Sequence, residues 1–382
     1  MNFNNWKEYK FSDFVSINPT ISLKGGNSFS FIEMKDLSEG KRYVHPSMDR
    51  KLTGGARFRE GNTLFARITP CLENGKIGQA IRLKDGVGFG STEFLIFEEK
   101  QNVSNKNFIY YLACWQEVRK FAEQNMVGTS GRQRVSKDAF EKLELTLPNI
   151  EIQQRIASIL SSLDDKIELN NQTNQTLETI AQTLFKEMCL PKGDKLPDGW
   201  RFGKLGEVAE INMGQSPAGT SYNQDGEGII FFQGKAEFGF RFPKIDKYTT
   251  EPKKYANKFD SLLSVRAPVG TINMATEKCC IGRGLAAISG KNNCSSFAFY
   301  LLKSLSVKFE MYNGEGTVFG SINKTDLENI EIGIPPKNVI EEFEKVGKSI
   351  DKLVYNNEQE TQTLTTLRDS LLPKLMKGEI NI

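Results

Sequence analysis

Arginine, lysine and glutamine side chains recur in the loops of two similar parts of the chain, and their chemistry is the most specific in the sequence. Arg and Lys bind phosphate, Arg also pairs with two acceptors of guanine at once, and Gln or Asn reads adenine. The candidate DNA contacts in the first part are Arg57, Arg59, Arg67, Arg132, Gln133 and Arg134, and those in the second part are Gln233, Lys235, Arg266, Arg283 and Ser321. Arg42 and Arg241 belong to the same basic clusters. Any one cluster is more typical of a solvated face, so the recurrence is what favours DNA contact.

Sequence signatures of catalysis are missing. The chain has no G-x-x-x-x-G-K-[ST] phosphate loop, no G-x-S-x-G nucleophile elbow and no [DNS]-P-P-[YF] loop of an amino-methyltransferase. The glycine run Gly86–Gly90 is not followed by the helix and acidic residue of a nucleotide site, and we interpret it as a turn. With His45 as the single histidine, a His-based metal site or catalytic triad is hard to build. We therefore expect a chain that binds without catalysing and that holds no metal or cofactor of its own.

Composition bounds the class of protein. The chain has 382 residues, room for two or three domains, and 50 Lys and Arg against 47 Asp and Glu leave a net charge of +3. Net charge alone therefore does not indicate a nucleic-acid binder, and the distribution of charge must decide. Six cysteines without C-x-x-C spacing indicate free thiols of a reducing compartment. Because no apolar run reaches the ~18 residues of a membrane span and no signal-peptide pattern is present, we expect a soluble cytoplasmic protein.

The chain contains the same unit twice. Trp6–Asn18 is similar to Trp200–Asn212, and Lys137–Pro148 is similar to Lys324–Pro335. The second copy begins about halfway along the chain, a period far longer than that of a solenoid, so the repeat indicates domain duplication. The prolines of F-A-R-I-T-P and L-S-V-R-A-P also correspond, and we pair Arg67 with Arg266 between these segments.

Each copy is predicted to be rich in short strands. Runs of alternating apolar and β-branched residues separated by Gly and Asn turns are typical of strands. These runs lie at residues 28–34, 62–68, 76–83 and 92–97 in the first copy and at 228–234, 261–266 and 286–290 in the second. A helix with a 3.6-residue apolar period is predicted at about Asn107–Asn125, and its counterpart runs through Phe297–Phe309.

A long helix with a heptad pattern follows each copy. Apolar residues alternate steps of four and three, which is the pattern of a helix-pairing seam. The seam positions are Ile156, Leu160, Leu163, Ile167, Leu177 and Leu184 in the first helix and Phe343, Val346, Ile350, Leu353, Leu364, Leu367 and Leu371 in the second. The economical partner of each helix is the other, with Asn170, Asn174 and Asn357 fixing register. The alternative is two separate amphipathic helices, each lying on its own domain.

These elements divide the chain into four parts. We predict an α+β fold in which two tandem domains, β-rich with helices, are joined by an antiparallel coiled coil of two long helices with pseudo-twofold symmetry. The boundaries are residues 1–148 for the first domain, 149–190 for the first long helix, 191–335 for the second domain and 336–382 for the second helix. Within the second domain, residues 191–199 contain two prolines and two glycines and are expected to form a linker.

The chain resembles the specificity subunit of a type I restriction-modification enzyme over essentially its whole length. The stretches that carry the resemblance are Leu196–Trp200 followed by Gly206–Val208, Ser130–Ser136, Glu151–Ile156 and Leu371–Ile380. The second copy departs from the pattern, since Thr317–Asn323 replaces the Gln-Arg loop and the start of its helix lacks the expected glutamine.

The resemblance implies a function. Each domain would read one half of an asymmetric bipartite site on double-stranded DNA, with the helices setting the half-site separation. Two methyltransferase subunits would bring S-adenosylmethionine, and restriction subunits would bring ATP and Mg²⁺, with neither cofactor on this chain. A rival hypothesis is a duplicated protein-interaction scaffold without DNA readout. A fused specificity, modification and cleavage enzyme is disfavoured by the missing methylation motif and by the length.

Overall fold

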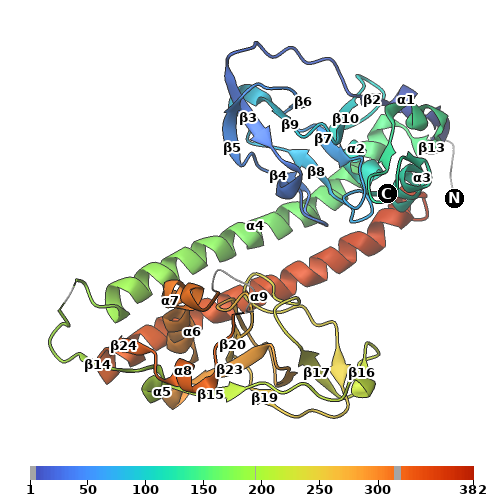
Figure 1. Ribbon diagram of the computed structural model, residues 1–382. Coiled ribbons are helices and arrows are strands. Elements are labelled where there is room, and N and C mark those ends of the chain that lie inside the picture. Colours follow the sequence, from blue (N-terminus) through green and yellow to red (C-terminus); the bar gives the residue numbers. More distant parts are fainter. Residues whose placement is uncertain (1–5, 194, 314–319) are drawn as a thin grey trace. The chain divides into compact units, whose positions relative to one another are not determined.

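The computed structural model describes residues 6–193, 195–313 and 320–382. The chain forms two compact units, one made of residues 1–170 with 360–382 and the other of residues 171–359. Each unit therefore contains one β-rich domain and one part of each long helix, α4 (Ile150–Cys189) and α9 (Lys337–Met376), which are coloured green and red in Figure 1.

Short strands build the domain of the first unit. An antiparallel pair joins its two ends, with β1 (Trp6–Lys10) along β13 (Glu144–Pro148). Between them lie a five-stranded sheet in the order β2-β10-β7-β8-β4, a four-stranded sheet in the order β5-β3-β9-β6, and the pair β11-β12. The bounds are β2 Val15–Ile17, β3 Ser28–Ile32, β4 Tyr43–Val44, β5 Met48–Lys51, β6 Ala56–Arg59, β7 Thr63–Ala66, β8 Ile77–Ala80, β9 Val87–Gly90, β10 Phe94–Glu99, β11 Met126–Val127 and β12 Arg134–Val135. The four strands predicted for this copy are confirmed.

The helices of this domain pack on the five-stranded sheet around phenylalanine rings. They are α1 Phe11–Phe14, α2 Lys106–Cys114 and α3 Gln116–Gln124, with short 3-10 turns at Met34–Asp36, Lys84–Gly86 and Lys137–Lys142. The ring of Phe97 lies 5.1 Å from that of Phe65 and 5.5 Å from that of Phe140. Strands β7 and β10 and the turn before β13 are thereby held in one core.

The single helix predicted at Asn107–Asn125 is wrong in one respect, because the structure breaks it at Trp115. This residue has extended backbone angles, φ −61° and ψ 133°, between α2 and α3. Nearly all of α2 is buried, whereas α3 buries one face. The break lets the two segments meet the core with different faces, which a continuous 3.6-residue period does not reveal.

The second unit repeats this plan with its own strand lengths. Its domain opens and closes with β14 (Arg201–Lys204) along β24 (Glu331–Ile334). The sheet order β15-β23-β20-β21 corresponds to β2-β10-β7-β8 of the first unit, and a second sheet has the order β16-β18-β17-β22-β19. The bounds are β15 Ala209–Met213, β16 Tyr222–Asn223, β17 Ile229–Phe232, β18 Tyr248–Thr249, β19 Tyr255–Ala256, β20 Ser261–Ser264, β21 Ile272–Met274, β22 Cys279–Ile281 and β23 Leu285–Gly290. The three strands predicted for this copy are confirmed.

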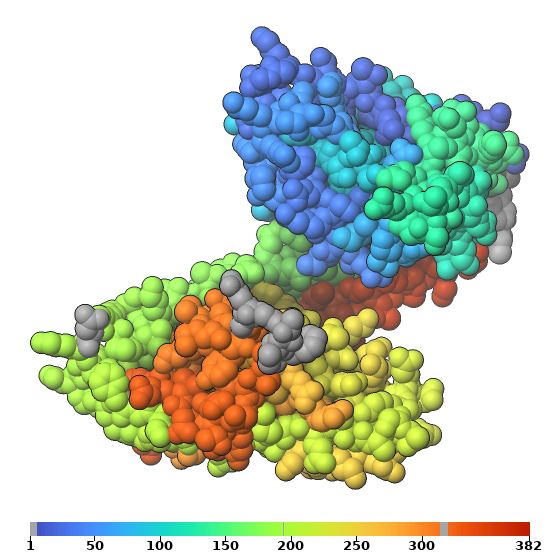
Figure 2. All heavy atoms as spheres, in the orientation of Figure 1, coloured from blue at the N-terminus to red at the C-terminus, as the bar shows by residue number. Residues whose placement is uncertain are grey.

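The helices of the second domain cover the matching face. They are α5 Leu205–Val208, α6 Ser295–Ser304, α7 Ser306–Glu310 and α8 Lys324–Glu328, with 3-10 turns at Gly219–Ser221, Lys291–Asn293 and Met311–Asn313. The break at Leu305 between α6 and α7 matches the break at Trp115. In Figure 2, α7 (orange) lies at the surface beside the last turns of α4 (light green), and α4, α6 and α7 together line a hollow there.

The glycine run Gly86–Gly90, which we interpreted as a turn, is a turn only at Gly86 and a strand from there on. Its residues 87–90 form β9, which runs parallel to β3 and antiparallel to β6. A Cβ atom on Gly90 would lie 2.3 Å from the carbonyl oxygen of Ile32, and one on Gly88 would lie 2.8 Å from that of Ser30. The glycines therefore permit close approach of two backbones, a packing role with no phosphate involved.

Segments of the two long helices lie side by side and antiparallel within each unit. In the first unit, Asn170 donates to Glu360 Oε2 at 2.9 Å, and Asp164 accepts from Arg368 at 2.7 Å. In the second unit, Asn357 donates to Asn174 Oδ1 at 2.8 Å. As the residue number on α4 rises, the residue number of its partner on α9 falls, as it must in antiparallel helices. The alternative of two helices lying separately on their own domains is therefore wrong within each unit.

The seam positions assigned to α4 are all at least half-buried, but three of those assigned to α9 are not. Val346, Leu353 and Leu367 are exposed, and the buried residues are Val354 and Arg368, one position further on. A step of one residue turns the helix by about 100°. Because α9 packs against a domain as well as against α4, its buried face is rotated away from the heptad seam, and polar Asp351 and Arg368 are buried on it.

This burial predicts which leucine matters for stability. Leu160 is 0% exposed and Leu367 is 43% exposed. Leu160→Ala should lower the free energy of unfolding by about 2–5 kcal/mol, because it removes packed methyl groups from a closed core. Leu367→Ala, the matched control, should lower it by less than about 1 kcal/mol. Urea unfolding of the full chain measures both, and equal losses would contradict the corrected seam.

Candidate nucleic-acid interface

A loop with a cis proline follows the same strand in both domains. The cis bonds are Thr69–Pro70 after β7 and Ala267–Pro268 after β20. The amide of Thr69 donates to the carbonyl of Gln133 at 3.1 Å, and the amide of Ala267 donates to the carbonyl of Gly320 at 2.9 Å. In each copy the same backbone contact thus joins the proline loop to a later segment. We call this the closing segment, residues 132–135 in the first copy and 320–322 in the second.

The same contacts correct our pairing of Arg67 with Arg266. The carbonyl of Arg67 accepts from Val135, and the carbonyl of Val265 accepts from Ile322. Arg67 is therefore equivalent to Val265, and Arg266 is equivalent to Ile68, the residue that bridges Arg134 in the first copy. Arg67 lies three residues before Pro70 and Arg266 two residues before Pro268, so the sequence already contains this offset of one position, and the hydrogen bonds confirm it.

The closing segment of the first domain carries three of the candidate contacts in three different states. Arg132 is exposed. Gln133 is half-buried, and its backbone amide donates to Thr69 Oγ1 at 3.1 Å. Arg134 forms a forked ion pair with Glu93, with Nε at 2.9 Å and Nη2 at 2.7 Å from Oε1. Arg132 is therefore the side chain most available for a ligand, whereas Arg134 is already held by a carboxylate.

The other three candidate arginines of the first domain fall in two places. Arg59 lies 3.2 Å from Glu98. Arg57 and Arg67 line one open hollow of about 420 Å³, together with Asn18, Thr20 and Thr92. Arg57 donates to the carbonyl of Ile21 at 3.0 Å, while Nε of Arg67 is buried without a hydrogen-bond partner in the described structure. The fold thus brings together Arg57 of β6 and Arg67, which follows β7, in a hollow lined by both small polar and apolar side chains.

In the second domain the candidates form two exposed groups. Gln233 and Arg283 meet because the amide of Gly284 donates to the carbonyl of Gln233 at 3.3 Å, and Lys235 follows on the same loop. Arg266 and Ser321 form an isolated β-bridge. The loop residues 314–319, which include part of the segment that differs from the first copy, lie outside the described residues. The two domains therefore place different side chains on an equivalent backbone frame.

Two of the basic residues that we assigned to the exposed clusters are buried instead. Arg42 is 4% exposed and Arg241 is 0% exposed. Arg241 pairs with the carboxylates of Glu178 and Asp351. Neither arginine can reach a nucleic acid without the domain opening, because each lies under its own domain. Burial is decided by residues far away in sequence, so a basic cluster alone does not reveal it.

A buried carboxyl lies beside Arg241. Burial raises the pKa of Glu358 to about 7, against an ordinary value of 4.5, although the backbone amides of Arg241 and Phe242 donate to it and oppose the shift. Its Oε1 is buried without a partner in the described structure. Glu358 on α9 thus holds the backbone at Arg241, partly in its protonated form near neutral pH.

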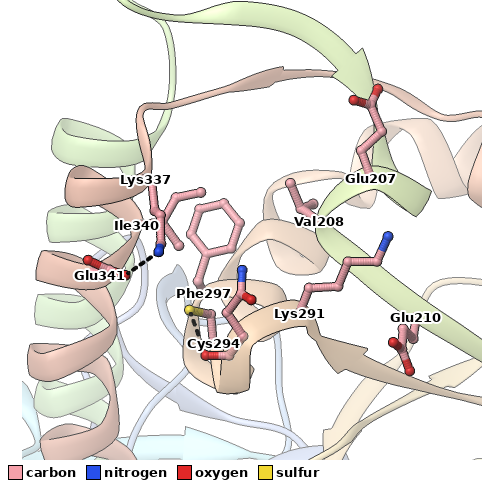
Figure 3. Close-up of a pocket in the computed structure, with 10 residues that line it drawn as sticks. Glu207, Val208, Glu210, Lys291, Cys294, Phe297, Lys337, Ile340 and Glu341 are labelled. Carbon is pink, nitrogen blue, oxygen red and sulfur yellow. Dashed lines mark hydrogen bonds and ion pairs between the residues drawn. The ribbon is translucent and has the colours of Figure 1, made fainter.

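A second hollow, of about 320 Å³, lies where the second domain meets the start of α9 (Figure 3). Both of its lysines have partners: Lys291 donates to the carbonyl of Gly206 at 2.7 Å, and Lys337 pairs with Glu341 on the next turn at 3.4 Å. Burial raises the pKa of the Cys294 thiol. A protonated thiol is a weak nucleophile, so the hollow offers packing and ion pairs and no activated group.

The remaining chemistry of the described residues is limited. No three His, Cys, Asp or Glu side chains gather there as metal ligands would. All six cysteines are free, as the sequence predicted. None of the helices in the described ranges has the length and apolar character needed to cross a membrane.

Comparison with known proteins shows the family. The family model described as "Type I restriction modification DNA specificity domain" matches residues 4–179 and again residues 197–368. A Methanocaldococcus jannaschii protein, provisionally named the MjaX type I restriction enzyme specificity subunit, is 33% identical over 84% of this chain and 79% of its own length. The HindI specificity subunit of Haemophilus influenzae is 24% identical over 98% of this chain and 99% of its own.

A solved structure shows the same fold. The type I restriction-modification S subunit from M. genitalium aligns over 97% of this chain and 96% of its own with a TM-score of 0.60, at 18% identity. The two matched segments of the family model correspond to the two copies found in the sequence.

The raised pKa of Glu358 makes stability depend on pH. Between about pH 4.5 and 7 the native carboxyl holds a proton that the unfolded chain has released, so the free energy of unfolding falls as pH rises through this window. Glu358→Gln should remove that fall, by up to about 1.4 kcal/mol per pH unit. Urea unfolding at pH 5 and pH 8 measures it, with exposed Glu342→Gln on the same helix as control. Parallel pH curves for wild type and Glu358→Gln would contradict the assignment.

Proposed function

The chain belongs to the type I restriction-modification DNA specificity family, and from that membership we propose how its two domains select a DNA site. Each domain reads one half of a bipartite sequence on double-stranded DNA. The observation that carries this proposal is the equivalent backbone frame with unlike side chains: Gln133 and Arg134 in one copy correspond to Gly320 and Ser321 in the other. Since base readout depends on side-chain donors and acceptors, the two half-sites should differ in sequence.

The arginines provide the ligand chemistry of this reading. Arg57, Arg67 and Arg132 in the first domain, and Arg266 and Arg283 in the second, carry guanidinium groups that can bind phosphate or guanine. Arg57 lies in β6, and the other four lie in loops next to strand ends, where side chains can project beyond the sheets. Arg134 has a different role in the proposal, because its pairing with Glu93 fixes the closing segment and presents Arg132.

The paired helices act as the spacer between the half-sites. The antiparallel contacts within each unit support an antiparallel coiled coil with pseudo-twofold symmetry. Asp164 of α4 and Asp351 of α9 support the symmetry, because both are buried and the offset between them equals the offset between Lys137 and Lys324 in the repeat. In this proposal the length of the spacer sets the separation at which the two domains meet DNA.

The symmetry also supports two equivalent docking surfaces for two methyltransferase subunits. Ile159 and Ile180 on α4 are exposed, and so are Val346 and Leu367, which follow them in α9 at that same offset. Exposed apolar side chains at equivalent positions are typical of an interface that recurs. The methyltransferase subunits would bring S-adenosylmethionine, restriction subunits would bring ATP and Mg²⁺, and this chain would hold no cofactor, perform no catalysis and work in the cytoplasm with the DNA.

The function is tested by mapping methylated bases in a strain with and without the gene. The proposal expects one bipartite motif that disappears with the gene. Binding of a duplex with this motif by the chain and its methyltransferase should weaken steeply as salt rises, because phosphate contacts release counterions. A protein-interaction scaffold predicts no motif and a shallow salt dependence of binding.

Arg132→Ala tests the assignment of one domain to one half-site. The exposed guanidinium should contribute about 1–3 kcal/mol of discrimination if it reads a base. Gel shift with duplexes changed in one half-site at a time should then show relaxed specificity in a single half. If specificity is unchanged and only the salt slope falls, by about one, Arg132 is a phosphate contact and its base-reading role is wrong.

The docking surfaces make a stoichiometric prediction. Ile180→Lys and Leu367→Lys should each remove one of the two methyltransferase subunits, because a charge cannot be buried at an apolar contact without cost. Thr179→Lys and Thr366→Lys are matched controls, since both threonines are exposed and each precedes a tested residue. Light scattering of the purified complex measures the mass. Two bound subunits in both tested variants would rule out these surfaces.

A further inference from the structure

A buried arginine joins the recognition domain to the long helices in each unit. In the first unit the side chain of Arg42 donates to Gln79 Oε1 at 3.1 Å and to Tyr111 Oη at 3.1 Å, both in the domain, and to Ser161 Oγ at 2.6 Å on α4. Its guanidinium also lies 5.3 Å from the centre of the Tyr111 ring. One side chain thus bonds to two elements of the domain and to one helix.

The network of the first unit extends to the second helix. Tyr111 donates to Asp164 Oδ2 on α4 at 2.6 Å. The other oxygen of Asp164 accepts from Arg368 on α9 at 2.7 Å, and Arg368 also donates to the carbonyl of Gly40 in the domain at 2.8 Å. Arg42, Asp164 and Arg368 are all buried. Domain, α4 and α9 are therefore tied by charged and directional bonds.

The second unit has an equivalent network. Arg241 pairs with Asp351 on α9 and Glu178 on α4, and it donates to Tyr300 Oη at 2.7 Å. Ser296 of the domain donates to the second oxygen of Asp351 at 2.6 Å. The guanidinium lies 4.4 Å from the centre of the Phe299 ring. Here the arginine of the domain pairs directly with both long helices, whereas Arg42 bonds to α4 and is joined to α9 through Tyr111, Asp164 and Arg368.

Three members of the network recur between the copies. Asp351 follows Asp164 at the offset of the repeat, Tyr300 follows Tyr111 at nearly the same offset, and Arg241 follows Arg42 at a slightly longer one. The fourth member differs, because the opposite helix contributes Arg368 in the first unit and Glu178 in the second. The two copies therefore keep the arginine, tyrosine and aspartate while the rest of the surroundings changed.

We propose that these two buried clusters of Arg, Tyr and Asp are positioning residues that fix the orientation of each recognition domain on the helix pair and so restrict the enzyme to one half-site spacing. This inference rests on the proposed function, and it assigns the clusters no contact with DNA. Apolar packing between a domain and a helix pair is non-directional and tolerates small rotations. Buried charges with fixed hydrogen bonds do not tolerate such rotations, because a rotation that breaks one bond leaves a desolvated charge without a partner.

The charge difference between the clusters predicts unequal sensitivity. Without Arg42, Asp164 still has Arg368 as a counter-ion. Without Arg241, the two carboxylates Glu178 and Asp351 are left with Lys303 as the nearest cation, which pairs with Glu178. Removal of Arg241 should therefore disturb its domain more than removal of Arg42 disturbs the first.

The test is the distribution of spacer lengths in the methylated motif of cells that carry the full system. Wild type should methylate its two half-sites at one spacing. Arg42→Gln should methylate the same half-site sequences at spacings one base pair shorter and longer as well, and Arg241→Gln should do so more strongly or lose methylation. Lys41→Gln and Lys244→Gln are matched controls, because both lysines are exposed beside the tested arginines, and they should keep the wild-type spacing.

A milder variant separates positioning from folding. Tyr111→Phe keeps the buried ring and removes only the hydroxyl that joins Arg42 to Asp164. This variant should therefore fold and still broaden the distribution of half-site spacings. Arg42→Lys, which keeps a charge but loses the fork, should give an intermediate broadening.

The outcomes are distinct. A single unchanged spacing in folded Arg42→Gln and Tyr111→Phe would overturn the inference, and so would a loss of methylation that only follows the folded fraction measured by circular dichroism. If wild type shows no bipartite motif, the proposed function fails instead, and that result is visible before any variant is made.

Discussion

The structure depends on the covering of two apolar helix faces that neither domain can cover alone. Each long helix is divided between the units, with the first part of α4 and the last part of α9 in one and the remaining parts in the other. Leu375 and Met376, close to the C-terminus, are buried in the core that contains Phe97 and Phe140 of the first domain. The core of the first domain is thus completed by nearly the last residues of the chain. The antiparallel direction of the helices follows from this requirement.

Buried charge has a different role from apolar area in this arrangement. Desolvation of Asp164 with Arg368, or of Asp351 with Arg241, cancels most of their attraction, so these pairs add little to stability. These pairs instead add orientational specificity, since hydrogen bonds to fixed partners allow one orientation of a domain on the helices. Apolar contacts bind each domain to the helices of its own unit, and the charged clusters fix the orientation of the domain on those helices.

Duplication explains why the two reading surfaces are alike in backbone and unlike in chemistry. The cis-proline loops make the same backbone bonds in both copies. The side chains on that frame have diverged, with Arg134 held by Glu93 in one copy and Ser321 at the equivalent place in the other. A shared frame keeps the geometry of approach, while free variation of its side chains changes what is read.

The sequence by itself determined the duplication, the seven strands that we predicted, the presence of a long helix after each copy and the family resemblance. These features depend on local propensity, short apolar patterns and turn residues, which act over a few neighbouring positions. Only the tertiary structure decided which arginines are exposed, which face of α9 is buried and that the predicted helix breaks at Trp115. Arg42 and Arg241 have the same local pattern as the exposed arginines, and they are buried because residues distant in the sequence close over them. Burial is a property of the assembled fold, and a sequence window contains no information about the segments that will cover it.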